Sequence, residues 1–392
     1  MKIAIIHMGF FYSGGGERTV LNEAIGLQKR GHYVDIFCPT LSNNCFPELM
    51  KQVNIREMFW WLPKSLQFRN AIGMVLTSIR STNLVKYFKN YDVILAHSQP
   101  SNWLAFQIKK KYGVPYVSYL HQVNRFLYPR RIDKIMGWNT SMDMILLSSL
   151  HKFNNIIKRM DKISIENANL VLSNSNWTRS KINDVYNVDS IVCHPGVNSI
   201  FMGLYNYGKN NERYVLSTNR HYPQKRLDYL IYIMSLVVKY YPDVKCIITG
   251  SFTRYTYYLM NLVKNFHLEK NIIFTNYLSE KDLLMRYRKA YLYAYTSPEE
   301  DFGLGPIEAG ACGVPSVVWD YAGPRETVIN GETGFRVSPY DLDEFADKII
   351  KVFSDRSLRE KLGWRALRFV KENFSLDKHI SILESALYSA IN

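Results

Sequence analysis

Short, continuous apolar runs recur along the whole chain, and each ends in a polar residue or a turn. In the first half they are KIAIIH, YVDIFC, DVILAH, PYVSYLH, ANLVLSN and SIVCH. The second half repeats the theme with RYVLSTN, VKCIITG, NIIFTN, YLYAYTS and PSVVW. Unbroken apolar strands that alternate with helix-length segments are typical of parallel sheets covered on both faces. The sequence therefore predicts an α/β fold with a parallel sheet in each half.

Length and composition indicate how these sheets are divided. A chain of 392 residues favours about two domains. The polar segment 198–213, rich in Gly, Asn and Tyr, is the predicted linker. We expect a first domain over 1–200 and a second over 201–375. The five cysteines show no paired spacing, which predicts neither disulfides nor structural zinc and indicates a reducing compartment.

The stretch 297–318 combines two acids with a glycine-rich turn. Glu300 and Glu308 flank the sequence Phe-Gly-Leu-Gly-Pro at 302–306, and a helix-like run follows. Backbone N–H groups at such a helix start favour a phosphate. One acid in the loop and one on the helix would reach opposite ends of an elongated ligand, such as a sugar and a ribose. The alternative is a surface loop and an amphipathic helix on which both glutamates are solvated.

Two cations follow the first strand of the second half. Arg220 and Lys225 stand five positions apart across a proline turn, at a predicted strand-to-helix junction. Fixed cations at such a junction can neutralise a departing diphosphate. An exposed basic turn is the alternative.

In the first half, a loop of three glycines, Gly14 to Gly16, precedes a predicted helix of about fifteen residues. Glycines there let a ligand approach the backbone closely. The loop is not a GxGxxG fingerprint, and no acidic residue closes the next strand, which argues against a nicotinamide enzyme. His7, His97 and His121 are predicted at strand ends, on the edge where such sheets bind ligands. Each is equally well explained as a histidine that caps backbone groups.

The pattern of two glutamates separated by seven residues, with Phe-Gly after the first and Gly-Val-Pro after the helix, resembles the signature of glycosyltransferase family 4. Members are retaining enzymes of the GT-B fold that use nucleotide-sugar donors. The resemblance implies two Rossmann-like domains whose parallel sheets face each other across a cleft. It also implies that the last helix, 376–392, packs back on the first domain. Asp301 stands where relatives often have glycine.

The resemblance assigns roles to the residues of this pattern. Arg220 and Lys225 would hold the donor diphosphate, Glu300 the sugar and Glu308 the ribose. The catalytic set implied is His121, Arg220, Lys225 and Glu300. Further donor contacts are expected from Gly15, Gly16, Asn276, Tyr277, Phe302, Gly303 and Leu304. Because the two cations would do the work of a metal and no DxD motif is present, neither a metal nor a cofactor is expected.

The segment 119–128, YLHQVNRFLY, resembles a motif of family members that add mannose to lipid-linked acceptors. It implies that His121, Arg125 and Glu17 lie at the acceptor. We expect transfer of mannose from GDP-mannose to a lipid-linked oligosaccharide or polysaccharide. The alternatives are a UDP-glucose- or UDP-N-acetylglucosamine-dependent transferase in cell-surface glycan synthesis, and a basic nucleic-acid-binding protein. The net charge of +15 allows the last, but no helix-turn-helix, RNP or zinc motif appears, so no nucleic-acid partner is expected.

Residues 58–91 interleave aromatic and basic side chains, among them Trp60, Trp61, Lys64 and Arg69. This composition suits a helix at an anionic membrane surface, and a buried amphipathic pair of helices explains it equally well. The first apolar run is too short for a signal peptide, and no run approaches the ~18 residues of a membrane span. We expect a cytoplasmic protein. Peripheral association with the inner face of the cell membrane is a hypothesis that follows from the first of these two explanations.

Overall fold

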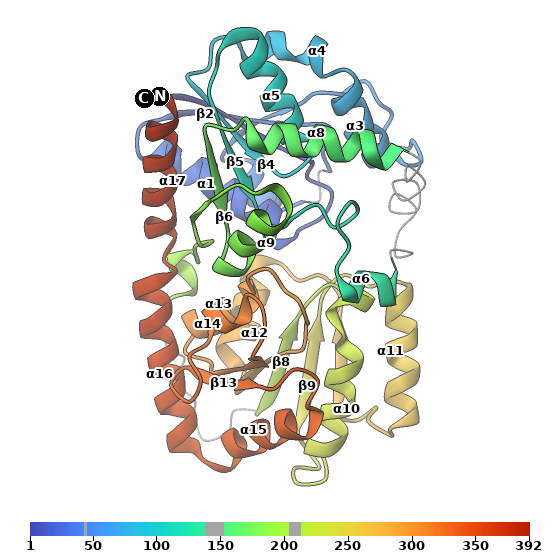
Figure 1. The fold of residues 1–392 in the computed structure, drawn as a ribbon. Coiled ribbons are helices and arrows are strands. Elements are labelled where there is room, and N and C mark those ends of the chain that lie inside the picture. The colour runs from blue at the N-terminus through green and yellow to red at the C-terminus, as the bar shows by residue number, and fades with distance from the viewer. Residues whose placement is uncertain (43–44, 138–152, 204–212) are drawn as a thin grey trace. The chain divides into compact units, whose positions relative to one another are not determined.

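The computed structural model describes residues 1–42, 45–137, 153–203 and 213–392, and the chain forms two compact units (Figure 1). Unit 1 contains residues 1–131, 137–196 and 376–392. Unit 2 contains residues 132–136 and 197–375. Most of the predicted linker, from 204 to 212, lies outside the described residues. Apolar residues also recur at helical spacing over 140–165, and the part of that segment from 140 to 152 lies outside the described residues as well.

Unit 1 is built on a sheet in the order β3-β2-β1-β4-β5-β6-β7, in which every pair of strands is parallel. The strands are β1 (Lys2–His7), β2 (Tyr33–Cys38), β3 (Asn54–Glu57), β4 (Val93–His97), β5 (Tyr116–Leu120), β6 (Leu170–Ser173) and β7 (Ile191–Val192). The helices of this part include α1 (Gly15–Lys29), α2 (Pro47–Met50), α3 (Arg69–Ile79), α4 (Ser81–Leu84), α5 (Ser101–Tyr112), α8 (Asn154–Glu166), α9 (Asn176–Tyr186) and α17 (Leu376–Ile391). Helix α6 (Arg131–Met136) precedes a gap in the described residues, and all of it but Arg131 belongs to unit 2.

Unit 2 has its own parallel sheet in the order β10-β9-β8-β11-β12-β13. Its strands are β8 (Tyr214–Thr218), β9 (Lys245–Thr249), β10 (Ile272–Thr275), β11 (Leu292–Tyr295), β12 (Ser316–Trp319) and β13 (Gly334–Val337). Its helices include the 3-10 turn η4 (Pro223–Lys225), α10 (Leu227–Val237), α11 (Arg254–Asn265), α12 (Glu280–Lys289), α13 (Leu304–Ala311), α14 (Pro324–Thr327), α15 (Leu342–Ser354) and α16 (Arg356–Asn373).

Each sheet is covered on both faces, as the unbroken apolar runs predict. On β1, Ile3 and Ile5 pack in one core cluster with residues of α1 and α17, whereas Ala4 and Ile6 pack in another with residues of α5. This two-residue alternation is the normal geometry of a strand. The prediction of two parallel α/β sheets is confirmed.

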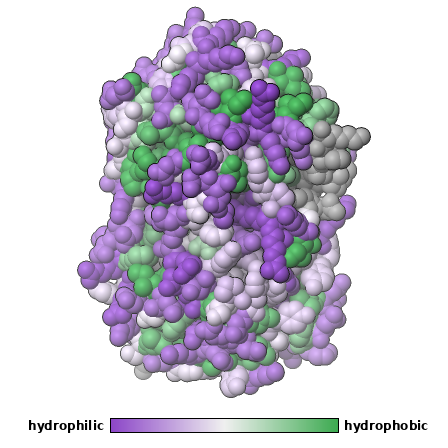
Figure 2. Space-filling view, viewed as in Figure 1, coloured by the Kyte–Doolittle hydropathy of each residue, from purple (hydrophilic) through white to green (hydrophobic). Residues whose placement is uncertain are grey.

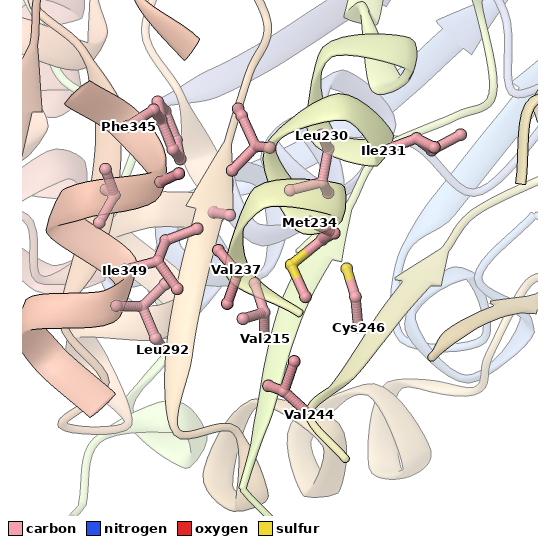
Figure 3. Close-up of a cluster of buried hydrophobic side chains, with 14 of the residues drawn as sticks. Val215, Leu230, Ile231, Met234, Val237, Val244, Cys246, Leu292, Phe345 and Ile349 are labelled. Atoms are coloured by element: carbon pink, nitrogen blue, oxygen red, sulfur yellow. The ribbon is translucent and has the colours of Figure 1, made fainter. Parts of the chain in front are cut away.

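The core of unit 2 shows how α10 and α15 cover one face of its sheet (Figure 3). Leu230, Met234 and Val237 of α10 point toward Val215 on β8, and Phe345 and Ile349 approach from α15. Helix positions 230, 234 and 237 lie on one face because they are spaced by four and three residues. On the face seen in Figure 2, hydrophobic and hydrophilic residues are intermixed.

Two strands, β3 and β13, are absent from the sequence prediction. Their sequences are NIRE and GFRV. Both are only four residues long and lie at an edge of their sheet. Each also contains a charged residue, so neither displays the unbroken apolar run on which the prediction depends.

Candidate functional site

Lys225 and Glu300 are brought together in unit 2, although 75 positions separate them in the sequence. Lys225 ends η4, after β8, and Glu300 lies in the loop after β11. Strands β8 and β11 are neighbours in the sheet, so their carboxyl ends meet. The two side chains form an ion pair, each with 21% of its surface exposed.

The charge of Glu300 is set by its partners. Burial works to raise its pKa, but the ammonium of Lys225 and hydrogen bonds, one of them from Ser297 Oγ at 2.9 Å, lower the pKa to about 2. Glu300 is therefore a carboxylate at neutral pH. A carboxylate that accepts hydrogen bonds only is suited to bind hydroxyl groups of a ligand.

The turn that carries Lys225 is fixed by its neighbours. Pro223 starts η4, and Arg226 after it takes a left-handed conformation at φ 48°. The Arg226 guanidinium pairs with Asp228 at 2.7 Å, and the Arg226 carbonyl accepts a hydrogen bond from Thr296 Oγ1 at 3.1 Å. This ties the lysine turn to the loop of Glu300. Arg220 lies at the start of the same connection, with its guanidinium 4.8 Å from the ring centroid of Tyr222.

Helix α13 starts directly after this loop. Gly303 precedes it with φ 99°, a backbone conformation that favours glycine. A Cβ atom at Gly305 would lie 2.0 Å from Tyr293 Oη, so only glycine fits there without displacement. Phe302 is buried beside this turn. The first N–H groups of the helix have no partner within it, which makes this start suitable for an anion.

Glu308 lies inside α13 and is 6% exposed. Tyr287 Oη donates to Glu308 Oε2 at 2.7 Å. Burial and the Glu308 charge raise the pKa of Tyr287 well above its usual value, so the hydroxyl keeps its proton as a donor. The alternative in which both glutamates are solvated on a surface helix is wrong, because one is buried and the other is ion-paired.

Several residues that sequence reasoning did not predict hold the loop of Glu300 or helix α13 in place. They are Ser297, Tyr287, Tyr293 and Gly323. The N–H of Gly323 donates to the Glu300 carbonyl at 2.9 Å, and a Cβ at Gly323 would lie 2.3 Å from the Asp301 carbonyl oxygen. The backbone of Asp301 therefore packs directly on Gly323. The two tyrosines gave no signal beyond the apolar pattern of their helix and strand.

Asn276 and Tyr277 follow β10, at the edge of the same sheet. Asn276 Oδ1 accepts a hydrogen bond from the Tyr277 N–H at 2.8 Å, and its carbonyl accepts one from Thr249 Oγ1 at 3.2 Å. Tyr277 is 46% exposed. Two strands, β9 and β8, lie between β10 and β11, and Glu300 is in the loop that follows β11.

The predicted residues of unit 1 gather around the start of α1 and the ends of β4 and β5. Gly15 and Gly16 begin α1, and a Cβ at Gly16 would meet no atom within 4 Å, so this position has open space. Glu17 is buried in the first helical turn. Arg125 lies in the turn after β5 and is partly exposed.

His121 is linked to a buried cluster of polar groups. Its Nε2 lies 2.9 Å from His97 Nδ1, and His97 Nε2 lies 2.9 Å from Glu23 Oε2. The other Glu23 oxygen lies 3.0 Å from His379 Nε2. Burial raises the pKa of Glu23, but His97 and His379 outweigh burial and lower it. The side chains of His97 and His121 therefore contact other side chains, which the interpretation as caps of backbone groups did not anticipate.

Among the described residues, no group of three or more His, Cys, Asp or Glu side chains is arranged so that it could hold a metal ion. None of the described helices is long and apolar enough to cross a membrane.

Comparison with known proteins identifies similar chains. Residues 13–199 match the model of the family described as Glycosyltransferase Family 4, and residues 206–368 match that of Glycosyl transferases group 1. The mouse alpha-1,3/1,6-mannosyltransferase ALG2 is 24% identical over 393 residues, which are 93% of this chain and 90% of the relative.

Two solved structures show the same fold over nearly the whole chain. Sucrose-phosphate synthase from Thermosynechococcus elongatus has a TM-score of 0.78 at 20% identity, covering 99% of this chain and 98% of its own. The Anabaena protein HepE in complex with UDP-glucose has a TM-score of 0.76 at 20% identity, covering 99% of this chain and 100% of its own.

Proposed function

Because the chain belongs to glycosyltransferase family 4, we propose that it transfers mannose from GDP-mannose to a lipid-linked oligosaccharide or polysaccharide, with retention at the anomeric carbon. The observation that carries the proposal is the ion pair of Lys225 and Glu300 beside the start of α13. It supports the proposal because a cation suited to a phosphate and a carboxylate suited to a sugar lie next to each other. The mannose assignment is supported by the sequence at 119–128 and by the mannosyltransferase relative.

In this proposal each group acts on a stated part of the donor. Lys225, Arg220 and the first N–H groups of α13 stabilise the negative charge that the departing diphosphate gains. Glu300 accepts hydrogen bonds from sugar hydroxyls, and Glu308 accepts them from the ribose. Asn276 and Tyr277 contact the base. Gly16 leaves room for the donor to approach the start of α1.

The transfer itself needs no protein nucleophile among these residues. The bond between the anomeric carbon and the phosphate oxygen breaks, and its electron pair stays on the diphosphate. The acceptor oxygen forms the new bond from the same face, and its proton passes to a diphosphate oxygen. We propose that the two cations and the helix start replace a metal in this step.

The donor is tested by thermal shift. A ligand that binds only the native state stabilises it by about 2.7 kcal/mol at a hundred times its Kd. We expect GDP and GDP-mannose to raise the Tm by several degrees, and UDP, UDP-glucose and UDP-N-acetylglucosamine to leave it unchanged. The same donors, radiolabelled in the sugar, are then offered with an isoprenoid-diphosphate-linked oligosaccharide. A shift and transfer with the uridine donors alone would assign this enzyme to the UDP-dependent alternative.

The membrane is the second part of the proposal. Trp60 and Trp61 are 77% and 49% exposed, in the loop before α3. Arg69, in contrast, does not belong to a cationic surface, because it is 9% exposed and pairs with Glu57. One face of helix α3 packs against the core of unit 1. We propose that the tryptophan loop, with Lys64 next to it, contacts an anionic membrane.

Replacing both tryptophans with alanine is expected to weaken cosedimentation with anionic vesicles at least ~10-fold, because two large apolar side chains no longer enter the interface. Trp364→Ala is the matched control, since Trp364 is 53% exposed on α16 in unit 2. Binding of the unmodified protein should also fall as salt rises. Equal binding by the double variant and the control, or no binding to anionic vesicles at all, would remove the membrane contact from the proposal.

A further inference from the structure

The buried cluster in unit 1 has one member at the surface and the others inside. Glu23 and His97 are fully buried, whereas His121 at the end of β5 keeps part of its surface exposed. The contacts run from the Glu23 carboxylate to His97, and from His97 to His121. They connect helix α1 with β4 and β5.

One cation in the cluster balances the negative charge of the Glu23 carboxylate. His379 of α17 contacts Glu23, and its Nδ1 faces the carbonyl of His194 at 2.8 Å. Burial opposes a charge on His379, but Cys193 and Glu23 together raise its pKa well above the usual value. His379 is thus the imidazolium that compensates the carboxylate. A second imidazolium in this buried place would be uncompensated, which is costly.

His121 itself is neutral. Burial, and to a smaller extent His97, lower its pKa to about 3. His7 on β1, whose ring centroid is 6.0 Å from that of His97, also has a pKa well below its usual value because it is buried. Tyr119, which packs on His121 with 4.4 Å between ring centroids, keeps its proton because burial raises its pKa. A neutral imidazole carries one proton and one lone pair, so its tautomer decides whether each nitrogen donates or accepts.

The order of contacts sets that tautomer. Glu23 Oε2 lies 2.9 Å from His97 Nε2, and although the two are not aligned as a straight hydrogen bond, the carboxylate favours a proton on that nitrogen. A neutral His97 then has its lone pair on Nδ1, which faces His121 Nε2. The proton of His121 must therefore lie on Nε2.

From this we propose that Glu23 and His97 are positioning residues, which fix His121 with its proton on Nε2 and leave Nδ1 to accept a hydrogen bond from a substrate hydroxyl. The inference rests on the proposed function for the identity of that hydroxyl, which belongs to the donor sugar or to the acceptor glycan. Glu23 on α1 and His97 on β4 would then affect the transfer reaction only through the position and tautomer of His121.

The first test reads the tautomer without any substrate. In the long-range ¹H–¹⁵N spectrum of protein labelled with ¹⁵N-histidine, assigned with the help of His121→Gln, His121 Nδ1 should show the shift of an unprotonated nitrogen. In Glu23→Gln that signal should move toward a mixture of tautomers. A protonated His121 Nδ1 in the unchanged protein would overturn the inference, whatever the enzyme transfers.

The second test separates positioning from support of the fold. His97→Asn keeps an acceptor oxygen near the place of Nδ1, whereas His97→Leu does not. We expect His97→Leu to lower kcat by about 10-fold to about 10²-fold, with the donor KM little changed, and His97→Asn to recover most of the loss. Asp161→Asn is the matched control, because Asp161 is a buried acid of the same unit that bonds Tyr186 at 2.7 Å, outside the cluster.

The outcomes distinguish a failure of the proposed function from a failure of the positioning role. If the unchanged enzyme transfers no sugar, the proposed function fails, and the spectrum still decides the tautomer. If it transfers sugar but His97→Leu, folded by its melting curve, keeps the full kcat, the positioning role fails alone. Equal losses in His97→Leu and His97→Asn, matched by Asp161→Asn, would show a structural effect and also reject that role.

Discussion

Replacing Lys225 with alanine is expected to lower kcat/KM for sugar transfer by about 10³-fold or more. A cation that stabilises a departing phosphate acts in the transition state, and comparable groups in other enzymes contribute ~10²-fold to ~10⁵-fold. The ammonium group of Lys225 pairs with Glu300 in this structure. In the proposed reaction it would face both the carboxylate and the diphosphate.

The loss has two separable causes, which a double-mutant cycle distinguishes. If Lys225 only holds Glu300 in place, Lys225→Ala should cost nothing further in a Glu300→Gln background. If it also contacts the diphosphate, the second substitution should lower the rate again by at least ~10-fold. Stabilisation by GDP, measured by thermal shift, should weaken in Lys225→Ala for the same reason. Lys239→Ala is the matched control, since Lys239 is an exposed lysine after α10 in the same unit.

The same variant changes stability with pH in a defined direction. The pKa of Glu300 is lowered to about 2, so its pairing stabilises the fold above the ordinary pKa of about 4.5 and loses this contribution as pH falls toward 2. Lys225→Ala removes the cation and should flatten that part of the stability curve, as measured by urea unfolding between pH 5 and 3. A folded Lys225→Ala variant with near-normal turnover would contradict the assignment of the site.

The parts of the fold that sequence reasoning predicted are those with a local signal. All eleven apolar runs became strands, and the last helix, expected over 376–392, spans Leu376–Ile391. Helix α1, predicted at about fifteen residues, spans Gly15–Lys29. Such elements follow from periodicity within a short window, which a single sequence displays directly.

The supporting contacts of the site could not be predicted, because their partners are far apart in the chain. Glu23 and His379 are separated by 356 positions, and Tyr287 and Glu308 by 21, with no pattern linking either pair. The aromatic and basic neighbours of Arg69 allowed either a membrane-facing or a buried position, and the structure shows it buried against Glu57. Burial of a charge depends on a partner from another element, and no local window contains that partner.

The second large effect is expected from Gly305→Ala, which should destabilise unit 2 by roughly 3 kcal/mol. The new Cβ would lie 2.0 Å from Tyr293 Oη and 2.7 Å from the ring carbon that bears it. Overpacking of this kind typically costs ~1–3 kcal/mol, and here the obstructing hydroxyl is itself held by Thr218 Oγ1 at 2.9 Å. A loss of this size lowers the Tm of a unit of this length by roughly 6–12 °C. Donor binding should weaken as well, since the start of α13 must move.

Gly16→Ala gives the informative contrast, because a Cβ there meets no protein atom within 4 Å. We expect no loss of stability, since alanine is the better helix former, but weaker stabilisation by the donor if that space belongs to it. Tyr293→Phe removes the obstructing oxygen, so adding it to Gly305→Ala should recover part of the lost stability, although phenylalanine alone forfeits the bonds to Thr218. If Gly305→Ala melted at the same temperature as the unchanged protein, the contact with Tyr293 would not explain why glycine occupies position 305. Only close approach of the ligand would then explain it.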